Sequence, residues 1–320
     1  MHKLSSFALL SLLAPLPAFA EVPQVVTDLP AVQSLAAQVM GDLGSPAVLL
    51  EQGGNAHTYQ LKPSQLRALE GADLVFWVGP EMTPWLDRAL DATAPKGVQI
   101  ALLADPGTHR QDFPAGAHDD DDDDHAAETE AGDHDDHEGE GEEHHHHSGL
   151  DPHAWLDPAN AEHWLGVIAE ALAKQDPEHA ETYRANATAA AASIADLDAK
   201  LTAELAPVKD RRFVVFHAAY GYFVDHYGLM APEALALGDA TDPGAAHIAE
   251  LRAELKSDKI VCAFPEAQHD PKQLTLLLDG TGVKLGGALD PSGSALPYGP
   301  GLYAALMQGL ADTLTGCLAK

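Results

Sequence analysis

The sequence has few basic residues, and this shortage excludes whole classes of function. It contains 18 Lys and Arg against 49 Asp and Glu, for a formal net charge of −31 over 320 residues. Such a field repels nucleic acid and anionic lipid and attracts cations. After the first twenty residues, no apolar run approaches the roughly 20 residues that span a bilayer. The composition therefore favours a metal ion or another cationic ligand.

Cysteine is also scarce, because Cys262 and Cys317 are the only two in the sequence. In an oxidising compartment, two isolated cysteines far apart in sequence are expected to form one disulfide. Closing a loop of this length would stabilise the fold by about 4 kcal/mol in the chain-entropy model. The alternative is a pair of thiolate metal ligands, which the lack of a CxxC spacing disfavours.

The N-terminus has the three regions of a secretory signal. A basic start at residues 1–3 is followed by an apolar run at 7–16 and by the small-residue sequence Ala-Phe-Ala at 18–20. We expect residues 1–20 to be a cleaved signal peptide and the mature chain to start near Glu21. No cysteine near this point could carry a lipid. The protein is therefore predicted to be exported in soluble form to the periplasm.

Short apolar runs alternate with amphipathic segments in two halves of the mature chain. Continuous apolar strands separated by helices indicate parallel α/β sheets. In the first half we expect strands at 25–29, 47–50, 73–79 and 98–103, and helices at 31–40, after residue 63, and at 85–90. In the second half we expect strands at 212–216, 259–264 and 283–287, and helices from 219 and at 245–256, 271–278 and 301–318.

Between the two halves, the sequence predicts two consecutive helices. The first runs from Asp157-Pro158 to about Lys174. The second, at 177–205, is Ala-rich, lacks internal Gly and Pro, and at 1.5 Å per residue would extend roughly 40 Å. We therefore predict an N-terminal α/β lobe at 21–175, a long rigid linking helix at 176–207, a C-terminal α/β lobe at 208–320, and a metal cleft between the lobes.

Three histidines lie where a strand or turn meets a loop or helix, and ligands of open α/β sheets gather at the carboxyl ends of strands. His57 follows the expected strand at 47–50, His153 lies in "LDPHAWLDP", and His217 ends "RFVVFH". An imidazole at the end of an apolar strand is costly to bury unless it is hydrogen-bonded or ligating. Singly, each histidine is compatible with a satisfied loop or core position. Together, in an acidic exported protein, they predict a Zn²⁺ site with water or a carboxylate in fourth place.

Four segments resemble the zinc-specific solute-binding proteins of ABC importers, the ZnuA-like group. They are "GGNAHTYQLKPSQL", "DPHAWLDPANA", "FVVFHAAYGYFVDHYGL" and "LGGALDPSG". The resemblance covers nearly the whole mature chain and implies zinc ligation by His57, His153 and His217. It also implies that Asp290 either coordinates the metal or leaves the fourth coordination position to a water molecule. Manganese-type relatives carry a carboxylate where His217 stands, and a third imidazole there favours zinc.

The resemblance also implies pairing of Cys262 with Cys317. One departure is "PEAQHDP", where relatives have an acidic-Pro-Gln-aromatic turn, so Glu266 or His269 can be placed differently around the cleft. This leaves His269 open as an extra ligand or as a surface residue. Four further histidines fall in expected helices and are predicted to be solvated or packed without a ligand role: His163, His179, His226 and His247.

An acidic, histidine-rich stretch at 118–147 carries fifteen Asp and Glu and no Lys or Arg, which leaves a charge of about −16 on the rest of the chain. We expect it to form a disordered loop at 115–149 that captures zinc weakly, because folding around an ion costs conformational entropy. A solvated acidic linker is the alternative. The accessory ligands would be His118, His125, His134, His137, His144, His145, His146 and His147.

The resemblance implies a monomeric, non-enzymatic zinc receptor that delivers Zn²⁺ to an inner-membrane ABC permease with its cytoplasmic ATPase, with a periplasmic zinc chaperone as a further candidate partner. The alternatives are a zinc buffer or chaperone not coupled to a permease, and a manganese-type solute-binding protein. A secreted zinc hydrolase is disfavoured, because no HExxH pattern supplies a general base beside two ligands.

Overall fold

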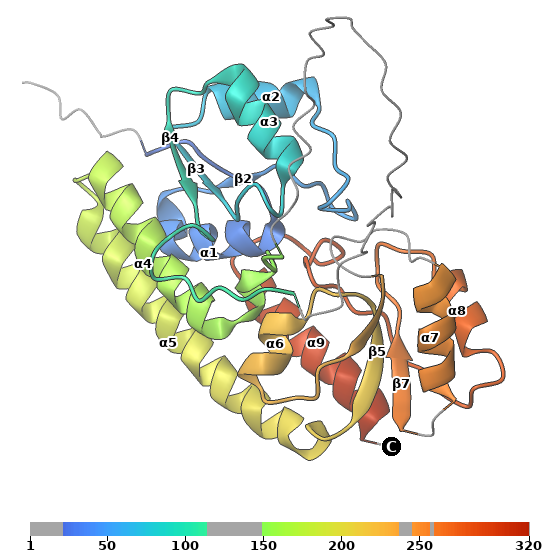
Figure 1. Cartoon of the computed structure of the whole chain (residues 1–320). Helices are drawn as coiled ribbons and strands as arrows, with labels where there is room; N and C mark the ends of the chain where they lie inside the picture. Colours follow the sequence, from blue (N-terminus) through green and yellow to red (C-terminus); the bar gives the residue numbers. More distant parts are fainter. Residues whose placement is uncertain (1–21, 114–148, 237–244, 257–258, 320) are drawn as a thin grey trace, which may run out of the picture.

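The structure is a computed structural model and describes residues 22–113, 149–236, 245–256 and 259–319. Two four-stranded parallel sheets form two lobes, and the longest helix runs along one side of both (Figure 1). The expected signal peptide and the acidic stretch at 118–147 lie outside the described residues. None of the described helices is long and apolar enough to cross a membrane.

Lobe one is built around a sheet with strand order β2-β1-β3-β4. Its strands are β1 (Val25–Thr27), β2 (Ala47–Val48), β3 (Leu74–Trp77) and β4 (Val98–Ala101). Its helices are α1 (Pro30–Met40), the short 3₁₀ helix η1 (Gly41–Leu43), α2 (Pro63–Glu70) and α3 (Pro84–Thr93). All three α-helices begin at a proline, whose fixed φ suits the first helical position. All four residues of β3 are buried, as expected for a strand covered on both faces.

Lobe two repeats the arrangement with strand order β6-β5-β7-β8. Its strands are β5 (Arg212–His217), β6 (Glu233–Ala236), β7 (Ile260–Phe264) and β8 (Lys284–Leu285). Its helices are α6 (Gly221–His226), α7 (Ala245–Leu255), α8 (Lys272–Leu278) and α9 (Leu302–Leu318). The predicted disulfide between Cys262 and Cys317 is confirmed, and it ties β7 to α9.

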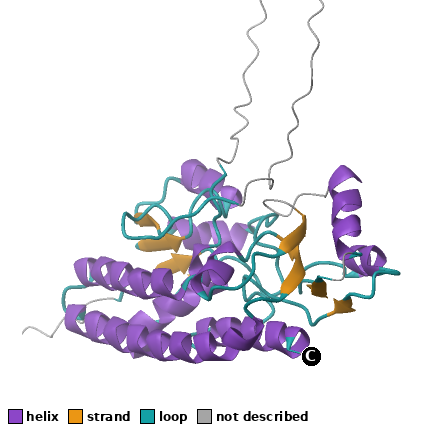
Figure 2. Ribbon diagram, turned by 60° about the horizontal axis from the view of Figure 1, so that its bottom comes forward, coloured by secondary structure: helices purple, strands orange, loops and turns teal. Residues whose placement is uncertain are grey.

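The two long helices are α4 (Pro158–Gln175) and α5 (Ala180–Leu205), and they lie side by side (Figure 2). The 3₁₀ helices η2 (Ala154–Leu156) and η3 (Ala206–Val208) flank this pair. The long helix starts at Ala180, three residues after the predicted start. The reason is Asp176, whose buried carboxylate pairs with the His179 ring and accepts a hydrogen bond from the Tyr183 hydroxyl, which holds the preceding residues in a turn.

Helix α5 contacts α1 in lobe one and α9 in lobe two. The main hydrophobic core is continuous through these contacts and includes Leu35 of α1, Ile194 of α5 and Leu310 of α9. Two smaller cores fill the outer faces of the two sheets. Because the main core crosses from one lobe to the other, large rigid-body movements would expose much apolar surface. The predicted boundaries at residues 175 and 207 stay predictions, since packing does not separate the lobes there.

Candidate metal centre

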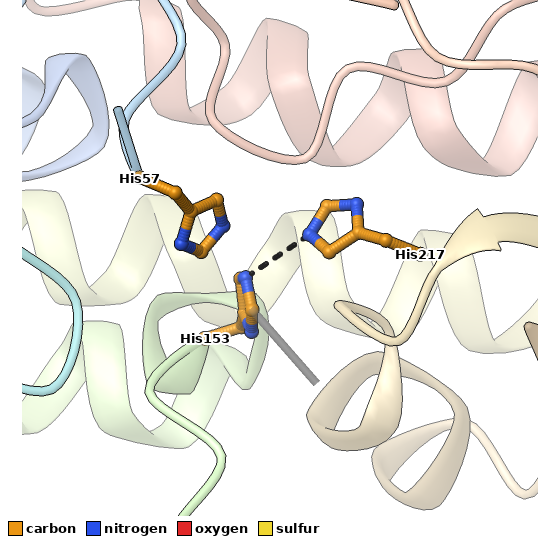
Figure 3. Close-up of side chains that lie close together, drawn as sticks. All are labelled: His57, His153 and His217. Atoms are coloured by element: carbon orange, nitrogen blue, oxygen red, sulfur yellow. Dashed lines mark hydrogen bonds between the residues drawn. The ribbon is translucent and has the colours of Figure 1, made fainter. Parts of the chain in front are cut away.

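Three imidazoles from three distant segments meet between the lobes (Figure 3). His57 lies in the loop after β2, His153 immediately precedes η2, and His217 is the last residue of β5. One ring nitrogen from each lies within 4.8 Å of one from each of the others. His153 and His217 are buried, with 1% and 3% of their surface exposed, whereas His57 is partly exposed. The structure thus brings together the three histidines that the sequence singled out.

Each buried imidazole has a carboxylate behind it. His153 Nδ1 lies 2.7 Å from Asp151 Oδ1, and His217 Nδ1 lies 2.7 Å from both oxygens of Glu266. An ionised carboxylate only accepts hydrogen bonds, so the proton belongs on Nδ1 and the lone pair is on Nε2. Both Nε2 atoms point toward the centre. Carboxylates in this position fix the tautomer and orientation of metal-binding histidines.

The two Nε2 atoms of His153 and His217 are 3.4 Å apart. Two lone pairs at this distance repel each other, and a cation between them removes the repulsion. In a tetrahedral zinc site with Zn–N bonds of about 2.0–2.1 Å, two ligand nitrogens are about 3.3–3.4 Å apart. The spacing of this pair therefore matches two ligands of one Zn²⁺ ion.

The electrostatics of the site favour a neutral His153 ring with negative charge behind the pair. Burial lowers the pKa of His153 well below its ordinary value, and the charge of His217 lowers it further, so His153 keeps its lone pair at neutral pH. Burial raises the pKa of Asp151 to about 7. Burial also acts to raise the pKa of Glu266, but the positive charge and hydrogen bond of His217 outweigh it and lower the pKa overall. A metal ion at the Nε2 atoms supplies positive charge that favours both ionised carboxylates.

His57 is presented by a loop that bridges the lobes. Its backbone N–H donates to Asn55 Oδ1 at 2.9 Å, and Trp85 Nε1 donates to the carbonyl group just before His57 at 2.6 Å. Across the cleft, the Gly53 N–H donates to the carbonyl of Ser294 in lobe two at 2.8 Å. His57 therefore completes the site from a loop whose position depends on both lobes.

The imidazoles line a small cavity of about 20 Å³. Since one water molecule needs roughly 10–15 Å³ on the same measure, the space suits one ion or one or two water molecules. It is too small for an organic ligand. The lining residues are Asn55, Ala56, His57, Met82, His153, Trp155, His217, Glu266, Gln268, His269, Pro291 and Ser292.

Asp290, the predicted fourth ligand, is engaged in its own loop. Its Oδ1 accepts hydrogen bonds from Gln268 Nε2 at 2.8 Å and from the Ser294 N–H at 3.2 Å, and its Oδ2 accepts from the Ala295 N–H at 2.8 Å. Among the described residues it is not part of the metal-binding group. Ligation by Asp290 stays a prediction, and in this structure its carboxylate organises the loop that follows it.

His269 lines the cavity without joining the group of three. Its ring stacks on Phe216 with centroids 4.2 Å apart, and its Nε2 lies 3.5 Å from Asn55 Nδ2. Its role as an extra ligand stays a prediction. The four helix histidines each have an oxygen partner elsewhere, consistent with packed or surface positions: His163 with Asp105, His179 with Asp176, His226 with Asp157 and Asp198, and His247 with the Ala234 carbonyl. The accessory loop histidines lie outside the described residues.

Sequence reasoning missed Asp151, and it named Glu266 near the cleft without placing it behind a ring. Asp151 stands two residues before His153, so a buried histidine in "LDPHAW" carried a local signal for its partner. The sequence signal for Glu266 as a partner of His217 was weaker. This residue lies two residues past the end of β7, the strand that pairs with β5, and this places it beside His217 only once the strand pairing is known. The departure at "PEAQHDP" therefore puts Glu266 behind the His217 ring in this structure.

Two parallel sheets braced by a long helix, with three inward-facing imidazoles between them, define a two-lobe metal-binding protein. The family described as "Zinc-uptake complex component A periplasmic", ZnuA, matches residues 25–317. The chain belongs to this family, and the resemblance predicted from the sequence is confirmed.

Relatives and solved structures agree with this assignment. The chain is 56% identical over 308 residues to the "High-affinity zinc uptake system protein ZnuA" of Paracoccus denitrificans, covering 95% of this chain and 94% of the relative. It is 40% identical to the Brucella suis protein of the same name, covering 92% of each. A zinc-bound ZnuA with residues 138-173 deleted superposes with a TM-score of 0.73 at 23% identity, covering 93% of this chain and 98% of that one. The periplasmic zinc-binding protein TroA of Treponema pallidum gives 0.72 at 19%, covering 93% and 99%. These two structures support the fold.

Proposed function

We propose that this protein is a periplasmic zinc receptor that binds Zn²⁺ between its lobes and delivers it to an ABC permease driven by a cytoplasmic ATPase. The observation that carries the proposal is the His153–His217 pair, whose Nε2 atoms lie at the spacing of two zinc ligands with a carboxylate behind each ring. Membership of a zinc-uptake family supports the same conclusion. His57 is the third ligand, and water or Asp290 is the fourth.

Two properties of the site favour zinc binding: its charges balance those of the ion, and its imidazole rings are already oriented. Zn²⁺ together with ionised Asp151 and Glu266 leaves no net charge in a buried place, which limits the cost of removing the ion from water. Three imidazoles suit zinc better than manganese, which prefers hard oxygen ligands. With a water molecule in fourth place such a site would also resemble catalytic zinc. The carboxylates near the rings, however, are occupied as partners of Nδ1 atoms, which supports a binding role.

The direct test measures zinc stoichiometry and affinity in the mature chain by competition with a chelator. The intact protein is compared with a form lacking residues 115–149, with His217→Ala, and with the control His247→Ala, whose ring bonds the Ala234 carbonyl. We expect tight binding of one ion to be lost in His217→Ala and kept in the other two variants. Loss of tight binding on deleting the loop, with His217→Ala binding normally, would overturn the ligand assignment.

The acidic stretch at 118–147 is proposed as an accessory that raises the local zinc concentration near the cleft. The loop deletion should lower total stoichiometry and zinc uptake under scarcity while the affinity of the cleft is unchanged. A solvated linker without metal would leave the stoichiometry at its full value.

A zinc buffer not coupled to a permease is the competing function. A strain without the gene should grow poorly under chelation and take up zinc slowly if the protein feeds an importer, and normal uptake would favour the buffer. Export to the periplasm is part of the proposal and is checked by locating the mature chain after cell fractionation.

A further inference from the structure

We propose that helix α6 is a brace that sets the distance between His153 and His217, with Tyr222 and His226 as positioning residues. The proposal rests on the proposed zinc function, since it concerns the geometry of the same site. Neither residue lines the metal cavity. Both act on the segment 151–157, which carries His153.

The position of α6 in the chain makes it suited to this role. It begins at Gly221, four residues after His217, so its own location is tied to the end of β5. Tyr222 and His226 are four residues apart and therefore lie on one face of the helix. The helix packs against η2, which directly follows His153. One short helix thus connects the two elements that supply the buried ligands.

The first turn of α6 holds the segment just before His153. The Tyr222 hydroxyl donates to the Asp151 carbonyl at 3.0 Å and accepts from the Gln111 N–H at 3.0 Å. Tyr222 is 1% exposed. The α6 backbone lies close to this segment, because a Cβ added at Gly221 would meet the side-chain ends of Gln111 and Asp151. The two hydrogen bonds of the Tyr222 hydroxyl therefore connect α6 directly to the residues before His153.

The last residue of α6 holds the segment just after His153. His226 Nδ1 lies 3.0 Å from Asp157 Oδ1, and His226 Nε2 lies 2.8 Å from Asp198 Oδ1 on α5. Asp157 also caps α4, accepting from the Ala159 N–H at 2.9 Å. The hydrogen bond to Asp157 is the main reason that the pKa of His226 is raised to about 9. The ring is therefore a cation between two carboxylates at neutral pH.

The α6 side chains consequently bond to both ends of the His153 segment. Tyr222 bonds to Asp151, two residues before His153, and His226 bonds to Asp157, four residues after it. The middle of the segment is held separately, because the Tyr303 hydroxyl donates to the Trp155 carbonyl at 3.0 Å and Trp155 Nε1 donates to the Pro291 carbonyl at 2.8 Å. Loss of one α6 contact should therefore loosen the 3.4 Å spacing of the ligand pair without detaching the segment.

The experiment compares two brace variants with a matched control in the mature chain. His226→Gln removes the cation, and Tyr222→Phe removes only the hydroxyl. The control His179→Gln removes a similar histidine–aspartate pair, 2.7 Å long, at the junction of α4 and α5 away from the ligand segment. Zinc dissociation is followed by stopped flow with excess chelator, the Co²⁺-substituted protein gives the visible absorption spectrum, and urea unfolding of the metal-free protein gives stability.

We expect each brace variant to release zinc about tenfold faster, the lower end of the range for losing a partner outside the ligand shell. The Co²⁺ spectrum should change in both brace variants. His179→Gln should stay within about twofold in rate and keep the wild-type spectrum, even where its stability falls as much. Wild-type release and spectrum in His226→Gln and Tyr222→Phe, or equal changes in His179→Gln, would overturn the brace. If His226→Gln does not fold, Tyr222→Phe alone decides between these outcomes.

Failure of the brace is distinguishable from failure of the zinc function. If His217→Ala binds zinc as tightly as the wild type, the proposed site itself is wrong. If His217→Ala loses zinc and the brace variants behave like the wild type, the site stands and α6 has no positioning role.

Discussion

The two halves of the metal centre are built differently. His153 and His217 are buried, each backed by a carboxylate at 2.7 Å, and sit on elements packed into the main core. His57 is partly exposed and comes from a loop held by hydrogen bonds that involve the Asn55 and Trp85 side chains and the Gly53 N–H. A receptor must bind its ion tightly and still release it to a transporter. From this difference we expect the fixed pair to govern affinity and the loop to govern exchange.

The most direct test of this difference removes one proposed ligand from each half. His153→Ala should weaken zinc binding by more than about a hundredfold, beyond the range for losing an outer partner, because a preformed ligand is lost. His57→Ala should weaken it less, since water can take the position of an exposed ligand. Chelator competition measures both constants. An equal loss in the two variants would show that the halves contribute alike.

Removing the charge behind a fixed ligand should have the next largest effect. Glu266→Gln keeps a carbonyl oxygen that can accept from His217 Nδ1, but it removes the negative charge that makes the ring more basic. We expect affinity to fall about 10- to 100-fold. Glu233→Gln is the control, because Glu233 is a surface partner of Arg212. Wild-type affinity in Glu266→Gln would mean that this carboxylate has no part in binding.

The same comparison explains which parts of the molecule the sequence could predict. The strands and helices depend on local apolar patterns, so β3, α4 and the sheet of lobe one follow from the sequence alone, while β6 of lobe two was not among the expected strands. The three histidines of the candidate metal centre were recognisable because each sits at the end of an apolar strand or in a distinctive turn. Local information was sufficient for these features.

Features that depend on particular side-chain contacts, whether near or distant in sequence, were not predictable. The α5 start shifted because Asp176 binds Tyr183 and His179, an arrangement that no helix propensity contains. Glu266 lies 49 residues from His217 and reaches it only through the pairing of β5 with β7. The contact between His226 and Asp157 likewise requires α6 to pack on η2.

The stability of the fixed half should depend on pH through His226. The groups facing this ring are Asp157, Asp198, Glu162 and the Tyr227 ring. Its pKa is raised from 6.5 to about 9 on folding. The stabilisation is therefore complete below about pH 6.5, declines between about 6.5 and 9, and is lost above that range. At pH 6 it should be about 1–2 kcal/mol after allowance for partial exposure.

Urea unfolding of the metal-free wild type and His226→Gln at pH 6, 7.5 and 9.5 checks this prediction. The difference in unfolding free energy between the two proteins should shrink as pH rises and be close to zero at pH 9.5. A difference that stays constant or grows with pH would contradict the assignment of a cationic His226.

The smallest expected effect concerns the loop half and separates rate from affinity. Asn55→Ala removes the side chain that accepts from the His57 N–H at 2.9 Å, a contact of about 1 kcal/mol. If the loop governs exchange, zinc should associate and dissociate several-fold faster while the dissociation constant changes less than about threefold. Asn186→Ala is the control, since the Asn186 amide donates to the Val39 carbonyl on the other side of lobe one. Slower release, or faster release without faster association and hence a large loss of affinity, would contradict this role of the loop and place His57 in the fixed half.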